Sequence, residues 1–242
     1  MKKLIVLLML LLIATPVIAE NTEKTYEIPD VKEVYSLGEH DENLILVKQR
    51  LQELEYYTSK NKPTNACYTI DLVAIIKRFQ IYSGLQATGN LDSQTLSLLF
   101  SDEALTDKNF FAQDETLIPE YYRLGIGDYI YSDYSGEYIY SSVQVKNKFK
   151  DKTVIACEVR FLPYSIWDEP MFDESNPPFA TTIFSIKPGE TKTSNKCALY
   201  NYKEMYDILI GISKFKLQDG TVVEVPEDKI LYYTLRGPFK PN

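Results

Sequence analysis

Histidine is nearly absent from this chain of 242 residues, which contains only His40. Catalytic zinc sites are held by two or three histidines in most hydrolases, and Ser-His or Cys-His catalysis needs a well-placed imidazole. The scarcity therefore excludes zinc amidase and zinc peptidase chemistry and argues against a histidine-activated nucleophile. We expect a protein that is not an enzyme and that needs no cofactor.

Cysteine is also scarce, with only Cys67, Cys157 and Cys197. One disulfide at most can form within the chain. Cys157 and Cys197 both fall in the strand-rich second half, so they are the expected pair if a bridge forms. The alternative is three buried, reduced thiols, because free cysteine packs as a small apolar side chain.

The apolar run at the N-terminus, Leu4 to Ile13, has 10 residues, whereas crossing a bilayer takes about 20. Two lysines precede the run, and small residues ending at Ala19 follow it, which is the order of a secretory signal. We expect residues 1–19 to be removed. The mature protein is then secreted, to the cell wall or the extracellular space, and has no membrane span.

Positive charge is in the minority, with 26 Lys and Arg against 34 Asp and Glu and a formal net charge of −8. Residues 1–19 contain two lysines and no acidic residue, so their removal makes the net charge −10. This balance argues against a nucleic-acid partner. The hydrophobic content of 45% is typical of a folded protein, and the length allows one large or two small domains.

Residues 32–105 have the pattern of three short amphipathic helices. Apolar residues at helical spacing form one face of the first helix: Leu44, Val47, Leu51 and Leu54. The second helix begins after Thr69 and has a stronger apolar face: Leu72, Ile75, Ile76 and Phe79. Asp92 is a suitable N-cap for the third helix. Such short helices must pack on one another to bury these faces, which predicts a compact helical module.

Several residues of this module occur in the order of a known family: Gly38, Leu44, Val47, Arg50, Leu51, Leu54, Tyr56, Tyr57, Phe79, Gln80, Gly84, Leu85, Thr88, Gly89, Leu91, Asp92, Thr95 and Leu99. Over residues 36–101 the chain resembles the peptidoglycan-binding domain found beside many bacterial cell-wall hydrolases. The resemblance implies a three-helix module that is not an enzyme and that holds its host on the cell wall.

Four positions depart from that family. Lys48, Glu55, Ala66 and Leu72 stand where glutamine, glycine, glycine and threonine are usual. All four lie in the first two thirds of the module. They leave open an alternative in which the fold is kept but glycan affinity is lost, so that the module docks a protein or acts as a spacer.

The expected receptor for a glycan is an aromatic platform with amide or hydroxyl groups beside it, because a sugar has apolar faces and hydroxyls. The candidate ligand-binding residues are Tyr56, Tyr57, Tyr68, Gln80 and Tyr82. Their ligand would be the glycan or the stem peptide of peptidoglycan. The alternative for each tyrosine is that its ring packs in the core.

Residues 106–120 are expected to form a linker or a short helix, and residues 121–242 a β-sandwich. The sandwich starts with a tyrosine-rich hairpin in which Tyr129, Tyr131, Tyr138 and Tyr140 alternate with smaller residues around a turn at Ser135–Gly136. These tyrosines have two interpretations, cross-strand support and an exposed ladder for glycan. Further strands are expected at residues 143–146, 154–161, 180–186, 198–202, 208–217, 221–225 and 230–235.

The second half also resembles the small immunoglobulin-like domains of secreted bacterial proteins. Asn147, the segment Lys152–Ile155 and the loop Pro188–Glu190 carry this resemblance, which implies fold and export but no activity. The overall expectation is a multidomain α and β protein.

An acidic loop surrounds the only tryptophan, with Asp168, Glu169, Asp173 and Glu174 near Trp167. Four carboxylates suit calcium, but the spacing matches no EF-hand. We interpret the loop as a solvated one and expect no metal site.

The favoured hypothesis is a secreted wall-associated protein whose helical module binds peptidoglycan and whose sandwich presents a surface to a protein partner. One alternative is a structural or interaction protein without glycan affinity. Another is a cell-wall glycan hydrolase, because a mechanism with two carboxylates needs no histidine.

Overall fold

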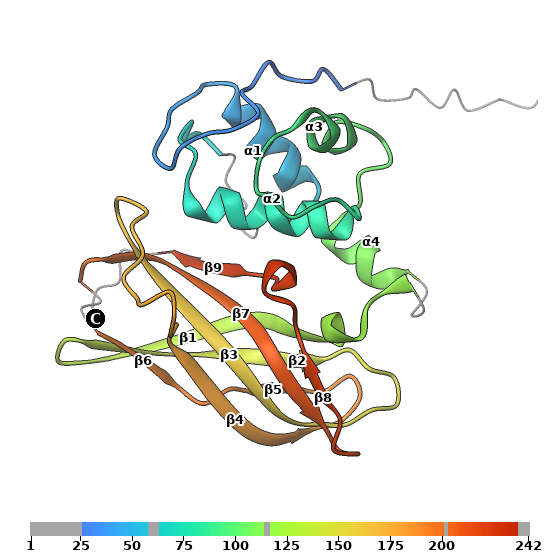
Figure 1. Cartoon of the computed structure of the whole chain (residues 1–242), viewed down its shortest axis with the longest axis vertical. Helices are drawn as coiled ribbons and strands as arrows, with labels where there is room; N and C mark the ends of the chain where they lie inside the picture. The colour runs from blue at the N-terminus through green and yellow to red at the C-terminus, as the bar shows by residue number, and fades with distance from the viewer. Residues whose placement is uncertain (1–25, 58–62, 114–116, 201–202, 237–242) are drawn as a thin grey trace, which may run out of the picture.

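The protein has a helical part stacked on two antiparallel sheets (Figure 1). The structure, a computed structural model, describes residues 26–57, 63–113, 117–200 and 203–236. The predicted secretory signal, residues 1–19, lies outside these ranges. Within them, the helices lack the combination of length and apolar character that crossing a membrane requires.

The three predicted helices are confirmed as α1 (Leu44–Glu53), α2 (Ile70–Tyr82) and α3 (Ser93–Leu99). Asp92 is the N-cap of α3, and its side chain accepts a hydrogen bond from the Thr95 backbone N–H at 2.7 Å. Thr69 holds the N-cap position of α2, but its side chain makes no capping hydrogen bond. The N-terminus of α2 therefore needs another acceptor.

The segment expected as a linker or a short helix forms the short helix α4 (Asp107–Ala112) and the 3-10 turn η2 (Glu120–Arg123). It is part of the same core and not a linker. Phe110, Ile118 and Tyr122 are buried against the residues of the three helices. We therefore define the helical module as residues 26–123.

One sheet contains β1 (Leu124–Ser135), β2 (Tyr138–Asn147), β5 (Thr191–Thr193) and β6 (Cys197–Tyr200). In it β1 pairs with β2, and β5 and β6 pair with the other edge of β2. The other sheet contains β3 (Val154–Ser165), β4 (Phe179–Ile186), β7 (Met205–Leu217), β8 (Val222–Glu224) and β9 (Tyr233–Arg236). Its order is β4-β3-β7, and both β8 and β9 pair with β7. The 3-10 turn η3 (Glu227–Lys229) lies between β8 and β9 in the chain. We call residues 124–236 the β domain.

The predicted tyrosine hairpin is confirmed, with Ser135 paired to Tyr138 across the turn. The strand expected at residues 143–146 is the continuation of β2, so hairpin and sheet are one structure. Residues from both sheets share one apolar core, which includes Val143, Phe161 and Ile208. The two sheets are therefore parts of a single folded unit.

The helical module rests on the outer face of the second sheet, with α2 closest to β7 and β9 (Figure 1). Ile70 and Ala74 on α2 are buried against Leu162 and Leu209 on the strands. We call the contact between the helical module and the second sheet the module–sheet interface. Within the β domain, an added Cβ at Gly211 would lie 2.6 Å from the Cγ2 of Ile230, so only glycine lets the segment with Ile230 lie against β7 here.

Two polar side chains, Arg78 and Asp168, reinforce the module–sheet interface. The Nη1 of Arg78 donates to the backbone oxygen of Tyr232 at 3.5 Å, and its guanidinium lies 4.5 Å from the ring centroid of Tyr233. The Oδ1 of Asp168, in the β3–β4 loop, accepts the backbone N–H of Ile70 at 3.0 Å. The acceptor that α2 needs at its N-terminus thus comes from the β domain.

Candidate functional site

A buried glutamine organises the turn between α2 and α3. Gln80 is fully buried, and its Nε2 lies 3.2 Å from the Oγ1 of Thr88 and 3.0 Å from both the Asn90 oxygen and the Thr95 Oγ1. Its Oε1 accepts the Gly89 N–H at 2.9 Å. A buried polar side chain is stable only when its groups are hydrogen-bonded, and here both ends of the amide are. Gln80 therefore fixes the position of the turn.

Tyr68 holds the same turn from the other side. Its hydroxyl donates to the backbone oxygen of Gly89 at 2.5 Å, and its ring stacks on Tyr35 with centroids 5.2 Å apart. Gly89 has φ +83°, and an added Cβ would lie 2.8 Å from the Cγ1 of Val73. Both facts require glycine at this position.

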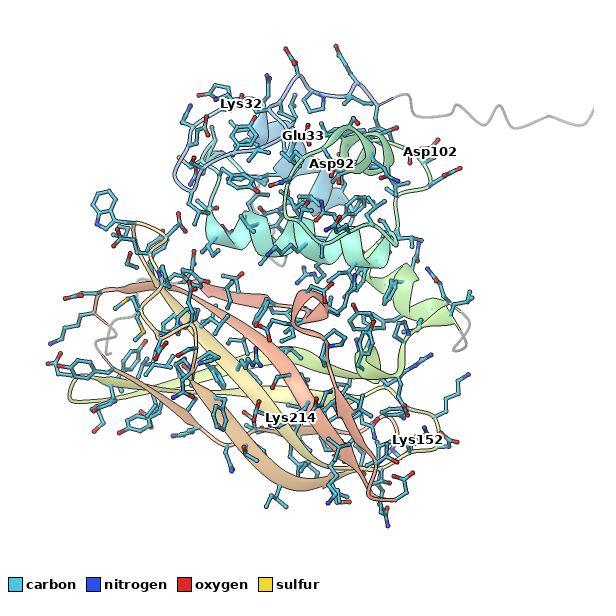
Figure 2. All side chains as sticks on the ribbon, in the orientation of Figure 1. Lys32, Glu33, Asp92, Asp102, Lys152 and Lys214 are labelled. Carbon is cyan, nitrogen blue, oxygen red and sulfur yellow. The ribbon has the colours of Figure 1, made fainter. Side chains whose placement is uncertain are left out.

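The outer surface of this turn, residues 84–90, is accessible, and Gln80 and Tyr68 hold its backbone from inside the module. Gln86 and Thr88 are exposed, and Asn90 is half-buried. Glu33 and Asp92, which flank the turn, lie on the side of the module away from the sheets (Figure 2). A preorganised turn with amide and hydroxyl groups can bind sugar hydroxyls without first being ordered. We call it the 84–90 turn.

The structure corrects the predicted set of ligand contacts. Tyr56, Tyr68 and Tyr82 are only 2–3% exposed, so their rings have no surface to offer a glycan strand. The hydroxyl of Tyr56 donates to the backbone oxygen of Leu105, and the ring of Tyr82 stacks on Phe110 with centroids 4.1 Å apart. Tyr56 and Tyr82 are thus covered by the segment that follows α3, which contains Leu105 and Phe110.

Of the five predicted residues, Tyr57 alone is half-buried and keeps part of its side chain accessible. It lies four positions after the end of α1, whereas the 84–90 turn joins α2 and α3. Gln80 and Tyr68 do meet at that turn, from inside the module. Sequence reasoning thus found the residues that hold the turn and missed the exposed residues on it, which have no aromatic ring to mark them.

The predicted disulfide between Cys157 and Cys197 is not formed, and all three cysteines are free thiols. Cys157 lies on β3 and Cys197 on β6, which belong to different sheets. Burial raises the pKa of Cys157 to about 12 and that of Cys197 to about 11. A thiol with so high a pKa is protonated near neutrality and is a poor nucleophile.

The single histidine has one neighbour that the sequence did not reveal. His40 and Cys67 are partners in an isolated antiparallel bridge, although 27 positions separate them in the chain. The imidazole Nε2 lies 3.3 Å from the Oε1 of Glu42, and the side chains of both residues are largely exposed. The imidazole is therefore engaged by a surface carboxylate.

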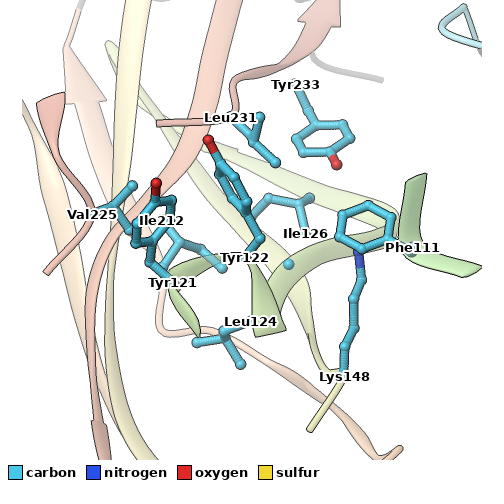
Figure 3. A pocket seen from close by; sticks show the side chains of 11 residues that line it. Phe111, Tyr121, Tyr122, Leu124, Ile126, Lys148, Ile212, Val225, Leu231 and Tyr233 are labelled. Atoms are coloured by element: carbon cyan, nitrogen blue, oxygen red, sulfur yellow. The ribbon is translucent and has the colours of Figure 1, made fainter. Parts of the chain in front are cut away.

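A small cavity lies where the helical module meets the β domain (Figure 3). Phe111, Tyr122 and Tyr233 contribute aromatic walls, and the amine of Lys148 lies 3.1 Å from the ring centroid of Phe111. Its volume of about 20 Å³ accommodates one water molecule. The cavity is too small for a saccharide or peptide ligand.

Metal-ligating side chains do not gather in this protein as far as the structure describes it: no group of three or more His, Cys, Asp or Glu could hold an ion. In the acidic loop, the carboxylate of Asp173 accepts hydrogen bonds from the Ser175 backbone N–H at 2.9 Å and its hydroxyl at 2.7 Å. These bonds lower the pKa of Asp173. Both local donors therefore bind the same carboxylate oxygen, Oδ1.

In the comparison with known proteins, one family model matches part of this chain. The model of the family described as "Putative peptidoglycan binding domain" matches residues 40–99, which include α1, α2, the 84–90 turn and α3. No curated protein matches the chain. A solved structure, the X-ray structure of Northeast Structural Genomics Consortium target SoR45, is similar at 10% identity over 48% of this chain and 86% of that chain. Its TM-score is 0.31.

Proposed function

We propose that this chain is a secreted protein, without enzymatic activity, that binds peptidoglycan of the cell wall through the 84–90 turn of its helical module. The match of residues 40–99 to a peptidoglycan-binding family carries this proposal. The turn in the last third of the matched region supports it, because Gln80 and Tyr68 hold its backbone in one conformation. The exposed amide of Gln86 is then the first contact that we would test.

The absence of activity is an inference from the ionisable side chains. Cys157 and Cys197 are buried thiols with raised pKa values, and His40 contacts a surface carboxylate. Nucleophilic catalysis needs a thiolate or hydroxyl with a base in hydrogen-bonding reach. These three residues do not provide that pairing with one another. Among the described residues, no hydrogen bond joins the His40 imidazole to the thiol of Cys67, its partner in the isolated bridge.

We also propose that the β domain is an immunoglobulin-like sandwich that presents a surface to a partner. The strand order supports this assignment: β1-β2 with β5 and β6 in one sheet, and β4-β3-β7 with β8 and β9 in the other. In an immunoglobulin-like sandwich, the second strand pairs with the first and with the fifth, and the third pairs with the penultimate one. In this protein β5 and β6 together take the place of the fifth strand, and β8 and β9 together take the place of the last one.

The experiment is co-sedimentation of the mature chain, residues 20–242, with insoluble peptidoglycan at physiological and at high salt. We expect the chain to pellet and Gln86→Ala to reduce the pelleted fraction. The matched control is Gln218→Ala, which changes an exposed glutamine at the far end of the β domain and should pellet like the unchanged chain.

Two outcomes would contradict the proposal. A mature chain that stays in solution would favour the alternative of a module that docks a protein. A fall in the turbidity of the peptidoglycan suspension would show lytic activity and favour the two-carboxylate hydrolase.

A further inference from the structure

The outer face of the first sheet carries a cluster of three tyrosines, of which two are exposed and Tyr140 is half-buried. Tyr138 and Tyr140 lie two positions apart on β2, so their side chains share one face, and their ring centroids are 6.2 Å apart. Tyr200 on β6 is paired with Tyr138 and meets its ring edge-on at 5.4 Å. Tyr138 is 41% exposed and Tyr200 is 64% exposed. Tyr138 is thus in ring contact with both Tyr140 and Tyr200, and the three rings form one aromatic cluster.

The charges around these three rings are paired. Lys196 lies 3.1 Å from Asp133, and Lys203 lies 3.1 Å from Glu137. Each pair joins an acidic residue of the hairpin to a lysine beside β6. The charges of these two pairs cancel, which suits a neutral ligand more than a nucleic acid or an anionic membrane.

A groove of about 480 Å³ adjoins the tyrosine face. It lies between β6 and the β3–β4 loop, and Tyr200 belongs to both the groove and the face. Among its lining residues are Met171, Phe172, Asp173, Asn176 and Met205. Ligand-binding pockets in proteins measure about 300–1,000 Å³ and combine apolar walls with a few polar groups. The groove has this composition and, unlike the junction cavity, has room for a sugar ring.

We propose that the groove and the tyrosine face form a saccharide-binding site for a neutral glycan chain, separate from the helical module. A sugar ring offers an apolar face for the tyrosines and several hydroxyl donors. The Asp173 carboxylate, ionised because its hydrogen bonds stabilise the charge, and the Asn176 amide supply acceptors for those donors. Only the choice of a cell-wall glycan as the natural source rests on the proposed function.

The test is calorimetric titration of the mature full chain with chitohexaose, a neutral hexamer of β-linked N-acetylglucosamine. We expect Tyr200→Ala to weaken binding by about tenfold, because it removes one stacking surface. Tyr200→Phe keeps the ring and should bind within about twofold of the unchanged chain. The control Trp167→Ala removes an aromatic side chain that is 79% exposed outside the groove, and should bind normally.

The same titration on Gln86→Ala separates this site from the module, because loss of the module contact should leave the Tyr200-dependent binding intact. If peptidoglycan does not retain the chain but chitohexaose still binds through Tyr200, only the proposed function fails. An unchanged chain that does not bind chitohexaose overturns the saccharide proposal. Equal weakening by Trp167→Ala would also overturn it. A third contradicting result would be that the chain binds a proline-rich decapeptide, as a peptide-binding aromatic groove would, and does not bind chitohexaose.

Discussion

At the scale of single residues, Gln80 shows why a polar residue can be essential to a turn without touching a ligand. Its amide is fully buried and contacts four groups on and beside the 84–90 turn. In Gln80→Ala those groups lose their partner, and we expect the free energy of unfolding to fall by about 2–4 kcal/mol. Urea denaturation would measure it. The control Gln94→Ala, at an exposed position on α3, should change stability by less than about 0.5 kcal/mol.

Glu55 occupies a backbone conformation that favours glycine. It follows the C-cap of α1 with φ 65°, where the related family usually has glycine. A left-handed conformation strains a residue with a Cβ, whereas glycine gains chain entropy in the unfolded state. The first effect is larger, so Glu55→Gly should raise the free energy of unfolding by about 0.5–1 kcal/mol. Glu55→Ala removes the charge but keeps the strain, and an equal gain from it would refute this explanation.

The cysteines predict a response to alkaline pH. Burial raises the pKa of Cys157 to about 12 in the folded chain, well above the ordinary value of a cysteine thiol. The protonated thiol therefore contributes stability that is complete below about pH 9 and is lost as the pH rises toward 12. Urea midpoints should fall from pH 9 to pH 11, and less steeply in a Cys157→Ala variant.

The three cysteines should also differ in their reaction with a thiol reagent. Iodoacetamide at pH 8 should label the half-buried Cys67 and spare Cys157 and Cys197 until the chain unfolds.

At the scale of elements, α2 takes its capping acceptor from a loop 98 positions away in the chain. Asp168 has φ 58°, which Asn tolerates better than Ala. Asp168→Ala removes the acceptor and keeps the strain, so we expect a loss of about 1–2 kcal/mol in the free energy of unfolding. Asp168→Asn keeps an oxygen that can accept from Ile70 and should cost less than half as much. Equal losses in urea denaturation would mean that charge, not the capping bond, is what α2 requires.

Local patterns predicted the elements well and the roles of their side chains poorly. The N-cap at Asp92 and the turn after Ser135 follow from nearby residues, and both are observed. The tyrosines at the helix ends are a contrast, because Tyr82 is buried by Phe110, which lies 28 positions further along. No periodicity within a helix reveals a ring that the next segment covers. Burial decided by a distant segment is therefore where the predicted contact set failed.

At the scale of the whole molecule, two parts were predicted, but their docking was not. Ile70 and Ala74 extend the apolar surface of α2 beyond the face that packs in the module. From the sequence they are simply further apolar residues of a strongly apolar helix. Their partners Leu162 and Leu209 stand on the outer face of a sheet, where alternation leads one to expect polar residues. Apolar residues on both surfaces make sense only once the surfaces meet.

The module–sheet interface should make the whole chain unfold as one cooperative unit. Leu209 is 5% exposed there, and Leu209→Ala leaves a cavity between the parts, so we expect a loss of about 2–4 kcal/mol. A weakened interface should also separate the unfolding of the helices from that of the strands. The measurement is urea denaturation followed by helical circular dichroism and by fluorescence of Trp167, which lies in the β domain. The two curves should coincide in the unchanged chain and in Ile183→Ala, whose side chain is 85% exposed on β4, and should diverge in Leu209→Ala. Separate transitions in the unchanged chain would mean that the parts fold independently and that the interface contributes little to stability.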